Sequence, residues 1–141
     1  MAKYNPALVD LLNKRLEVSR EKYPSIPEYA RPKASYKTND ANGLTKAIVD
    51  FIDLSGGWAT RISVEGRYIE SLGKRIPSSV KKGTADIHAV YKGKHLSIEV
   101  KIGADRQSDE QKSVEKSINA SGGYYFIAKT FEQFHQWFIT L

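Results

Sequence analysis

The sequence predicts a mixed α/β domain in which helices flank a small central sheet, with one additional helix at the N-terminus. Apolar residues recur at helical spacing in several segments, and short apolar runs with partial alternation lie between them. Paired glycines mark where two of the helices end. The expected order in the core is α-β-β-β-α-β-α. A chain of 141 residues suits a single globular domain overall.

The N-terminal residues 1–41 are expected to form a helix and an extended connection. Asn5 and Pro6 are a typical helix start, and the leucines that follow recur at helical spacing, which predicts an amphipathic helix over residues 6–20. Three prolines prevent its continuation, so residues 21–40 should run extended along the surface. The sequence shows no chemistry in this segment.

Residues 42–141 form the expected core. A helix is predicted over residues 44–54, with Asn39 or Asn42 as its N-cap. The remaining elements follow in order along the chain: strands over 58–65, 85–91 and 95–101, a helix over 108–120 capped by Ser108, a strand over 124–128 and a last helix starting at Thr130. Phe131, Phe134, Trp137 and Phe138 of that last helix are expected to be core or dimer contacts rather than base-stacking groups.

A basic segment, residues 66–83, separates the first two predicted strands. Three glycines and Pro77 predict an irregular loop. With Arg61, it supplies the expected DNA-binding residues, which are Arg61, Arg67, Lys74, Arg75, Lys81 and Lys82. A solvated loop whose lysines bind nothing specific is the alternative.

Composition narrows the classes of function. The formal net charge of +6 and the pI of about 9.4 favour a polyanionic partner, nucleic acid first and an anionic membrane second, although solubility alone would also explain them. Because the chain has no cysteine, disulfides, Cys-based zinc sites and thiol catalysis are excluded. No apolar run is long enough for a transmembrane helix, and the first residues lack the apolar stretch of a signal peptide, so a cytoplasmic location is expected.

The motif that points to chemistry is Asp86, followed by Glu99 and Lys101. The Glu-x-Lys pattern also occurs at residues 110–112, but there it falls in a predicted helix, where residues two apart point in different directions. In a strand, Glu99 and Lys101 share one face. If Gly93 and Lys94 form a type II′ turn, Asp86 lies opposite Lys101 and His88 lies opposite Glu99, which brings all three motif residues to that face.

Two carboxylates held together repel each other, and a divalent cation would offset that repulsion. Mg²⁺ prefers hard oxygen ligands, polarises a phosphodiester and lowers the pKa of bound water. A nearby lysine would stabilise the charge that develops on the phosphate. An idle salt-bridge cluster on an exposed sheet face is the alternative.

Four segments together carry a family resemblance: Gly83-Thr-Ala-Asp-Ile, Ser97-Ile-Glu-Val-Lys, Gln107-Ser-Asp-Glu-Gln and Gly122-Gly-Tyr-Tyr-Phe-Ile. They resemble the PD-(D/E)XK nuclease superfamily and, more narrowly, its VRR-NUC branch in the small, stand-alone, phage-type form. The similarity covers about residues 42–135. It implies a restriction-endonuclease-like core and a Mg²⁺- or Mn²⁺-dependent DNA endonuclease.

The resemblance also implies residue roles. Asp86, Glu99 and the Val100 carbonyl would bind metal, Lys101 would act on the water or the transition state, and Gln111 would position water or the DNA backbone. Similar stand-alone members act on Holliday-junction-like branched DNA as homodimers, in a bacterial or phage-infected cell. No membrane partner is expected.

Two positions depart from the family pattern. Ala85 replaces the proline before the first acid, and the first core helix offers Asn42 in place of an acid, with Asp40 before it and Asp50 and Asp53 far along it. The second departure leaves the number of metals open.

Three further alternatives remain at this stage. One is a nucleic-acid-binding module of the same fold without catalysis, another is a flap or nicking nuclease, and a third is a protein-interaction domain. His88 is a weaker candidate for a ligand or base, because a lone histidine on a strand is more often structural.

Overall fold

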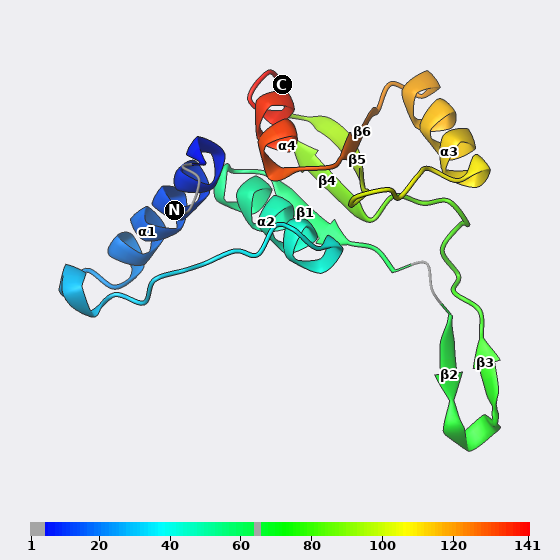
Figure 1. Ribbon diagram of the computed structural model, residues 1–141, viewed down its shortest axis with the longest axis horizontal. Helices are drawn as coiled ribbons and strands as arrows, with labels where there is room; N and C mark the ends of the chain where they lie inside the picture. The colour runs from blue at the N-terminus through cyan, green and yellow to red at the C-terminus, as the bar shows by residue number, and fades with distance from the viewer. Residues whose placement is uncertain (1–4, 64–65) are drawn as a thin grey trace.

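The computed structural model describes residues 5–63 and 66–141, and its main sheet has four strands in the order β1-β4-β5-β6 (Figure 1). The strands are β1 (Trp58–Arg61), β4 (Ile87–Tyr91), β5 (Lys94–Val100) and β6 (Tyr124–Ala128). Neighbours β1, β4 and β5 are antiparallel, whereas β6 runs parallel to β5. Helices flank this sheet, so the predicted mixed α/β class is confirmed.

Each long helix begins at a side-chain cap. The helices are α1 (Pro6–Lys22), α2 (Ala41–Leu54), α3 (Asp109–Ala120) and α4 (Phe131–Phe138). Asn5, Ser108 and Thr130 cap α1, α3 and α4 as the sequence predicts. The predicted cap of α2 is wrong: the Gly43 N–H donates to Asp40, because Asp40 directly precedes the first turn. Among the described residues, no helix is long and apolar enough to cross a membrane.

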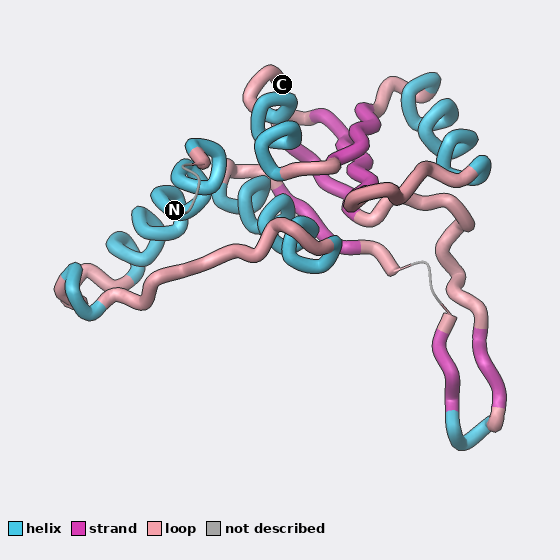
Figure 2. The backbone as a smooth tube through the Cα atoms, viewed as in Figure 1, coloured by secondary structure: helices cyan, strands magenta, loops and turns pink. Residues whose placement is uncertain are grey.

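The N-terminal segment packs into the same core as the rest of the chain. After α1, the chain makes a short 3₁₀ turn, η1 (Glu28–Ala30), and runs back beside the helix to α2 (Figure 2). Ala7 and Leu11 of α1 are buried among the core residues. Residues 1–4 lie outside the described part of the chain.

The hydrophobic core lies between the sheet and helices α2 and α4. Phe51 of α2 is surrounded by aromatic rings of α4, with ring centroids 5.5–6.0 Å away in edge-on contacts. Phe131, Phe134 and Phe138 are buried, and Trp137 stacks on Phe126 with centroids 4.4 Å apart. The aromatic residues of α4 therefore belong to the core.

The turn between β4 and β5 differs from the predicted one. It consists of Lys92 and Gly93, both at positive φ (49° and 73°), which is typical of type I′. Tyr91 pairs with Lys94, so His88 lies opposite Ser97, and the same register continued places Asp86 opposite Glu99. The predicted pairings were wrong by two residues. Because side chains alternate with a period of two, the faces are unchanged.

Residues 66–82, here named the basic arm, contain a hairpin and not the irregular loop that was predicted. Its strands are β2 (Arg67–Ile69) and β3 (Lys74–Ile76), joined by the short turn η2 (Glu70–Leu72) and by Gly73 at φ 62°. The hairpin projects away from the main sheet (Figure 1). The preceding strand, predicted to run to residue 65, ends at Arg61, and Val64 and Glu65 lie outside the described residues.

Candidate active site

The sheet has one apolar face and one polar face. Ile87, Ala89 and Leu96 point to the core beneath α2 and α4. Strand alternation and register give the opposite face, here called the polar face, the side chains of His88, Ser97, Glu99 and Tyr125. Ser97 and Glu99 are nevertheless buried. Polar groups are thus buried on the side of the sheet away from the core.

Asp86 precedes β4, and both its side chain and its backbone carbonyl are held by hydrogen bonds from backbone N–H groups. Its side-chain Oδ2 accepts a hydrogen bond from the Val100 N–H at 2.9 Å, and its carbonyl accepts one from the Ile62 N–H at 2.7 Å. The N–H and C=O of one strand residue point to the same side, so the Val100 carbonyl also lies on the side of Asp86. The three predicted metal ligands are therefore neighbours.

Glu99 is an unusually placed carboxylate. Its side chain is 4% exposed, and its Oε1 lies 2.8 Å from Gln111 Nε2 and 3.4 Å from Lys101 Nζ. Its Oε2 is buried and has no hydrogen-bond partner among the described residues. Burial, reinforced by the negative charge of Asp86 and opposed by Lys101, raises the pKa of Glu99 to about 7. The site thus holds a buried carboxylate of which one oxygen, Oε2, has no partner among the described residues.

Gln111 links the start of α3 to Glu99. Its Oε1 accepts from the Ser108 N–H at 2.9 Å in a capping box, while its Nε2 donates to Glu99. Both ends of the amide are therefore used, one to begin the helix and the other to hold the carboxylate.

The position of α3 depends on close contact with the end of the basic arm. Gly83 has φ 87°, and a Cβ there would lie 2.6 Å from the Glu110 backbone, so the chain passes directly against the first turn of α3. Lys82 pairs with Glu110 at 3.0 Å across the same junction.

The structure adds three residues that sequence reasoning missed: Ser97, Gln107 and Tyr125. Ser97 Oγ, Gln107 Nε2 and Tyr125 Oη are buried and have no hydrogen-bond partner among the described residues. Burial raises the pKa of Tyr125 to about 12, opposed by the neighbouring Gln107 amide and reinforced by the negative charge of Glu99. Alternation from Glu99 would have identified Ser97, but Tyr125 required the parallel pairing of β5 with β6, which the sequence does not specify.

His88 does not lie opposite Glu99, as the predicted register implied. Its Nδ1 lies 3.1 Å from His95 Nε2, and its own Nε2 is buried without a partner among the described residues. Burial and the neighbouring His95 lower the pKa of His88. The two histidines therefore form a pair with each other.

The predicted DNA-binding residues do not form one patch. Arg67, Lys74 and Arg75 are exposed on the hairpin of the basic arm, and Lys81 is exposed further along it. Arg61 pairs in register with Ile87, which gives it the face opposite the polar face.

The acids near the first core helix have other partners. Asp40 caps α2, Asp53 accepts from the Ala59 N–H, and Asp50 binds Tyr36 and Lys46.

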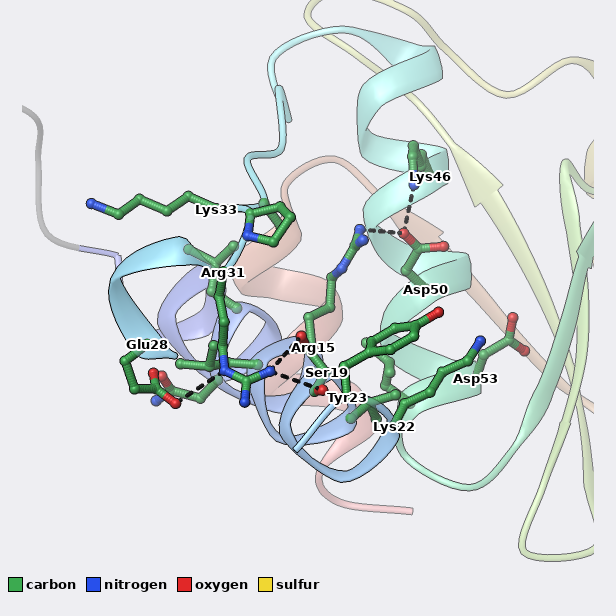
Figure 3. A pocket seen from close by; sticks show the side chains of 17 residues that line it. Arg15, Ser19, Lys22, Tyr23, Glu28, Arg31, Lys33, Lys46, Asp50 and Asp53 are labelled. Atoms are coloured by element: carbon green, nitrogen blue, oxygen red, sulfur yellow. Dashed lines mark hydrogen bonds and ion pairs between the residues drawn. The ribbon is translucent and has the colours of Figure 1, made fainter. Parts of the chain in front are cut away.

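A cavity of about 900 Å³ lies elsewhere, between α1, the connection that follows it and α2 (Figure 3). Its two most connected charged groups have partners within the protein: Arg31 donates to Ser19 and Glu28, and Asp50 contacts Arg15 and Lys46. No residue of the polar face lines it. The cavity therefore adds nothing to the site around Glu99.

The donor set suits a hard divalent cation that is completed by water and substrate. Within residues 5–63 and 66–141, no group of three or more His, Asp or Glu side chains is placed to hold a metal alone. Asp86 and Glu99, with the Val100 carbonyl on the same side, offer oxygen ligands of the kind Mg²⁺ takes when it keeps several waters. The unpartnered Glu99 Oε2 is the observation that fits such an ion.

Comparison with protein-family models gives no match to this chain, and comparison with curated proteins finds no relative. The family resemblance therefore rests on the residues and their spacing.

Proposed function

We propose that the chain is a Mg²⁺- or Mn²⁺-dependent DNA endonuclease of the PD-(D/E)XK type, with the VRR-NUC branch as its nearest resemblance. The single observation that carries the proposal is the convergence of Asp86, Glu99 and Lys101 on the polar face, with Glu99 Oε2 buried and unpartnered. Branched DNA as substrate, a homodimer as the active form and a restriction-endonuclease-like core belong to the same proposal.

Asp86 and Glu99, with the Val100 carbonyl, would hold the metal. The bound ion supplies Lewis-acid polarisation of the phosphodiester and a more acidic water. Asp86 is held for this task by the Val100 N–H, and Glu99 by the Gln111 amide, so neither carboxylate has to reorient when substrate arrives. Preorganisation of this kind reduces the cost of reaching the transition state.

Lys101 would supply a second positive charge near the phosphate, in addition to that of the metal ion. Its side chain is 11% exposed and is held 3.4 Å from Glu99 Oε1, at the end of β5. A cation with so little access to water interacts more strongly with a developing phosphate charge than an exposed lysine would. Its role is to stabilise that charge or to orient the attacking water.

A binding module without catalysis is disfavoured by the same cluster. Two carboxylates beside a phosphate-binding surface would repel DNA, and burying them costs stability unless an ion offsets their charge. Nothing about DNA binding alone requires that arrangement.

Cleavage of labelled DNA tests the proposal. Purified protein is incubated with a four-way junction, a flap and a linear duplex in Mg²⁺, in Mn²⁺ and in EDTA. We expect cutting with either metal, none in EDTA, and faster cutting of the branched substrates. Absence of cutting in both metals would falsify the enzyme assignment and leave the binding module.

The Lys101→Ala variant tests the role of the lysine. We expect it to bind DNA with nearly wild-type affinity and to cut at least about 100-fold more slowly. A variant that cuts at the full rate would remove Lys101 from the mechanism while leaving the metal ligands in place.

A further inference from the structure

The hairpin of the basic arm has no structural partner in the described chain. Its side chains Tyr68, Leu72 and Ile76 are 61%, 57% and 40% exposed. An isolated two-stranded hairpin is only marginally stable in water. Exposed apolar side chains on such a hairpin indicate a surface that gains contacts when something binds to it.

The charge of the arm identifies the kind of partner. Residues 66–82 carry five basic side chains and a single acidic one, Glu70. Lys82 is paired with Glu110, but Arg67, Lys74 and Lys81 form no ion pair with a described residue. A second copy of this chain, which is itself basic, would be repelled by this surface. A polyanion would be attracted to it.

Both faces of the hairpin combine basic and apolar side chains. Arg67 pairs with Ile76 and Ile69 with Lys74 on one face, and Tyr68 pairs with Arg75 on the other. A two-stranded ribbon inside the major groove turns one face to the base edges and meets phosphates along its two sides. Guanidinium and ammonium groups suit phosphates and guanine edges, whereas isoleucine suits thymine methyl groups.

The base of the arm also has a concave, cationic surface. Gly66, Arg75, Pro77, Ser78, Val80 and Lys82 line a pocket there. It lies between the hairpin and the residues that contact α3, so a phosphate bound in it would connect the arm to the rest of the site.

The position of the arm relates it to Asp86. The chain leaves β1 at Ile62, which donates to the Asp86 carbonyl, and returns through Gly83 to Asp86 itself. A segment from Ile62 to Leu72 spans at most about 35 Å when fully extended. That is about the length of one turn of B-DNA.

We propose that the hairpin of residues 67–76 is a β-ribbon that occupies the major groove of duplex DNA, within about one helical turn of the cleaved bond. The major groove admits a two-stranded ribbon. The inference rests on the proposed function for the position of the cleaved bond, but the binding of DNA by the arm does not depend on catalysis.

The test compares two variants with the same change in net charge. Lys74→Glu/Arg75→Glu alters the arm, and Lys22→Glu/Lys33→Glu alters exposed lysines beside α1. Binding of a fluorescein-labelled duplex is measured in Ca²⁺ over a range of salt. We expect at least about a tenfold loss of affinity for the arm variant, with a shallower salt dependence by about 2 in log–log slope, beyond the effect of the control pair. Circular dichroism and thermal melting verify that both variants fold.

Guanine N7 protection from methylation locates the groove. Wild-type protein should protect major-groove N7 atoms within about one turn of the cut, and the arm variant should lose that protection. Equal affinity of the two variants, or wild-type binding without N7 protection, overturns the assignment. So does an arm variant that dissociates a dimer without losing affinity for DNA. Specific protection without any cleavage in Mg²⁺ would instead reject the proposed enzyme and retain the arm.

Discussion

Glu99 and Asp50 are both carboxylates of the same domain, and they differ in how their charge is satisfied. Asp50 Oδ2 lies 2.7 Å from Lys46 and 3.6 Å from Arg15 (Figure 3). It also accepts from the Tyr36 hydroxyl at 2.8 Å, so one acid is surrounded by two cations and a hydroxyl. Glu99 is more deeply buried, has one lysine beside it, and faces a second acid, Asp86.

The difference separates an internally paired cluster from the proposed metal-binding one. The Asp50 carboxylate is satisfied within the protein by two cations and a hydroxyl, so it needs no bound cation. Around Glu99 the buried polar atoms without a partner accumulate on one face of the sheet, and such groups require an explanation. The contrast indicates that buried polar atoms without a partner, more than the number of charged residues, distinguish the candidate site.

The largest expected effect is on catalysis. Asp86→Asn keeps the shape of the side chain and removes its charge, so we expect DNA cleavage in Mg²⁺ to fall at least about 100-fold. Asp50→Asn serves as the matched control and should retain activity within about twofold. Initial rates on a saturating branched substrate measure both. A comparable loss of cleavage in the two variants would show that the Asp86 carboxylate is no more important for catalysis than that of Asp50.

The next effect is on stability and follows from the pKa of Glu99, which rises from 4.5 to about 7 in the folded protein. Below pH 4.5 the group is protonated in both states. Between pH 4.5 and 7 the unfolded chain releases its proton first, so the folded state loses stability as pH rises. By about pH 8 the loss is complete, at about 3 kcal/mol.

Glu99→Gln removes this dependence, because glutamine does not ionise. In EDTA, we expect the variant to gain about 3 kcal/mol relative to wild type between pH 4.5 and pH 8. Urea unfolding of both proteins at each pH measures the difference, and the paired comparison cancels the contributions of groups such as His88. If the free energies of unfolding of the two proteins change with pH in parallel, the ionised Glu99 carboxylate does not destabilise the folded state.

The smallest effect is expected at the Asp50 cluster. Lys46→Ala removes an ion pair whose lysine side chain is 63% exposed, and exposed pairs contribute about 0.2–1 kcal/mol. We expect a loss of stability in that range, and a smaller one in 1 M salt, as measured by urea unfolding. A loss several times larger would mean that the Asp50 carboxylate depends on Lys46 for its neutralisation and is not otherwise satisfied.

The sequence predicted the elements around the site because local signals mark them. Asn5, Ser108 and Thr130 are caps that depend on a few neighbouring residues, and the alternation at Glu99 and Lys101 fixes their shared face. Asp86, Glu99, Lys101 and Gln111 are accordingly brought together. Their roles in catalysis stay a prediction.

What the sequence did not predict depends on competing local choices or on distant contacts. Lys92 adopts positive φ, so the turn formed one position earlier than glycine alone suggested. The strands of the arm are three residues each, too short for alternation to be distinguished from an irregular loop. Tyr125 reaches the site through a parallel pairing that only the folded sheet specifies.

The hydrogen bond between the Ile62 N–H and the Asp86 carbonyl has a consequence for how such a protein can diversify. Because the chain on either side of the basic arm meets at this bond, the inserted segment behaves as an exchangeable unit whose length and sequence can change without moving the strands that carry the carboxylates. In the proposed endonuclease, substrate preference and cutting chemistry are then encoded in separate stretches of the gene, and one can be exchanged while the other is kept.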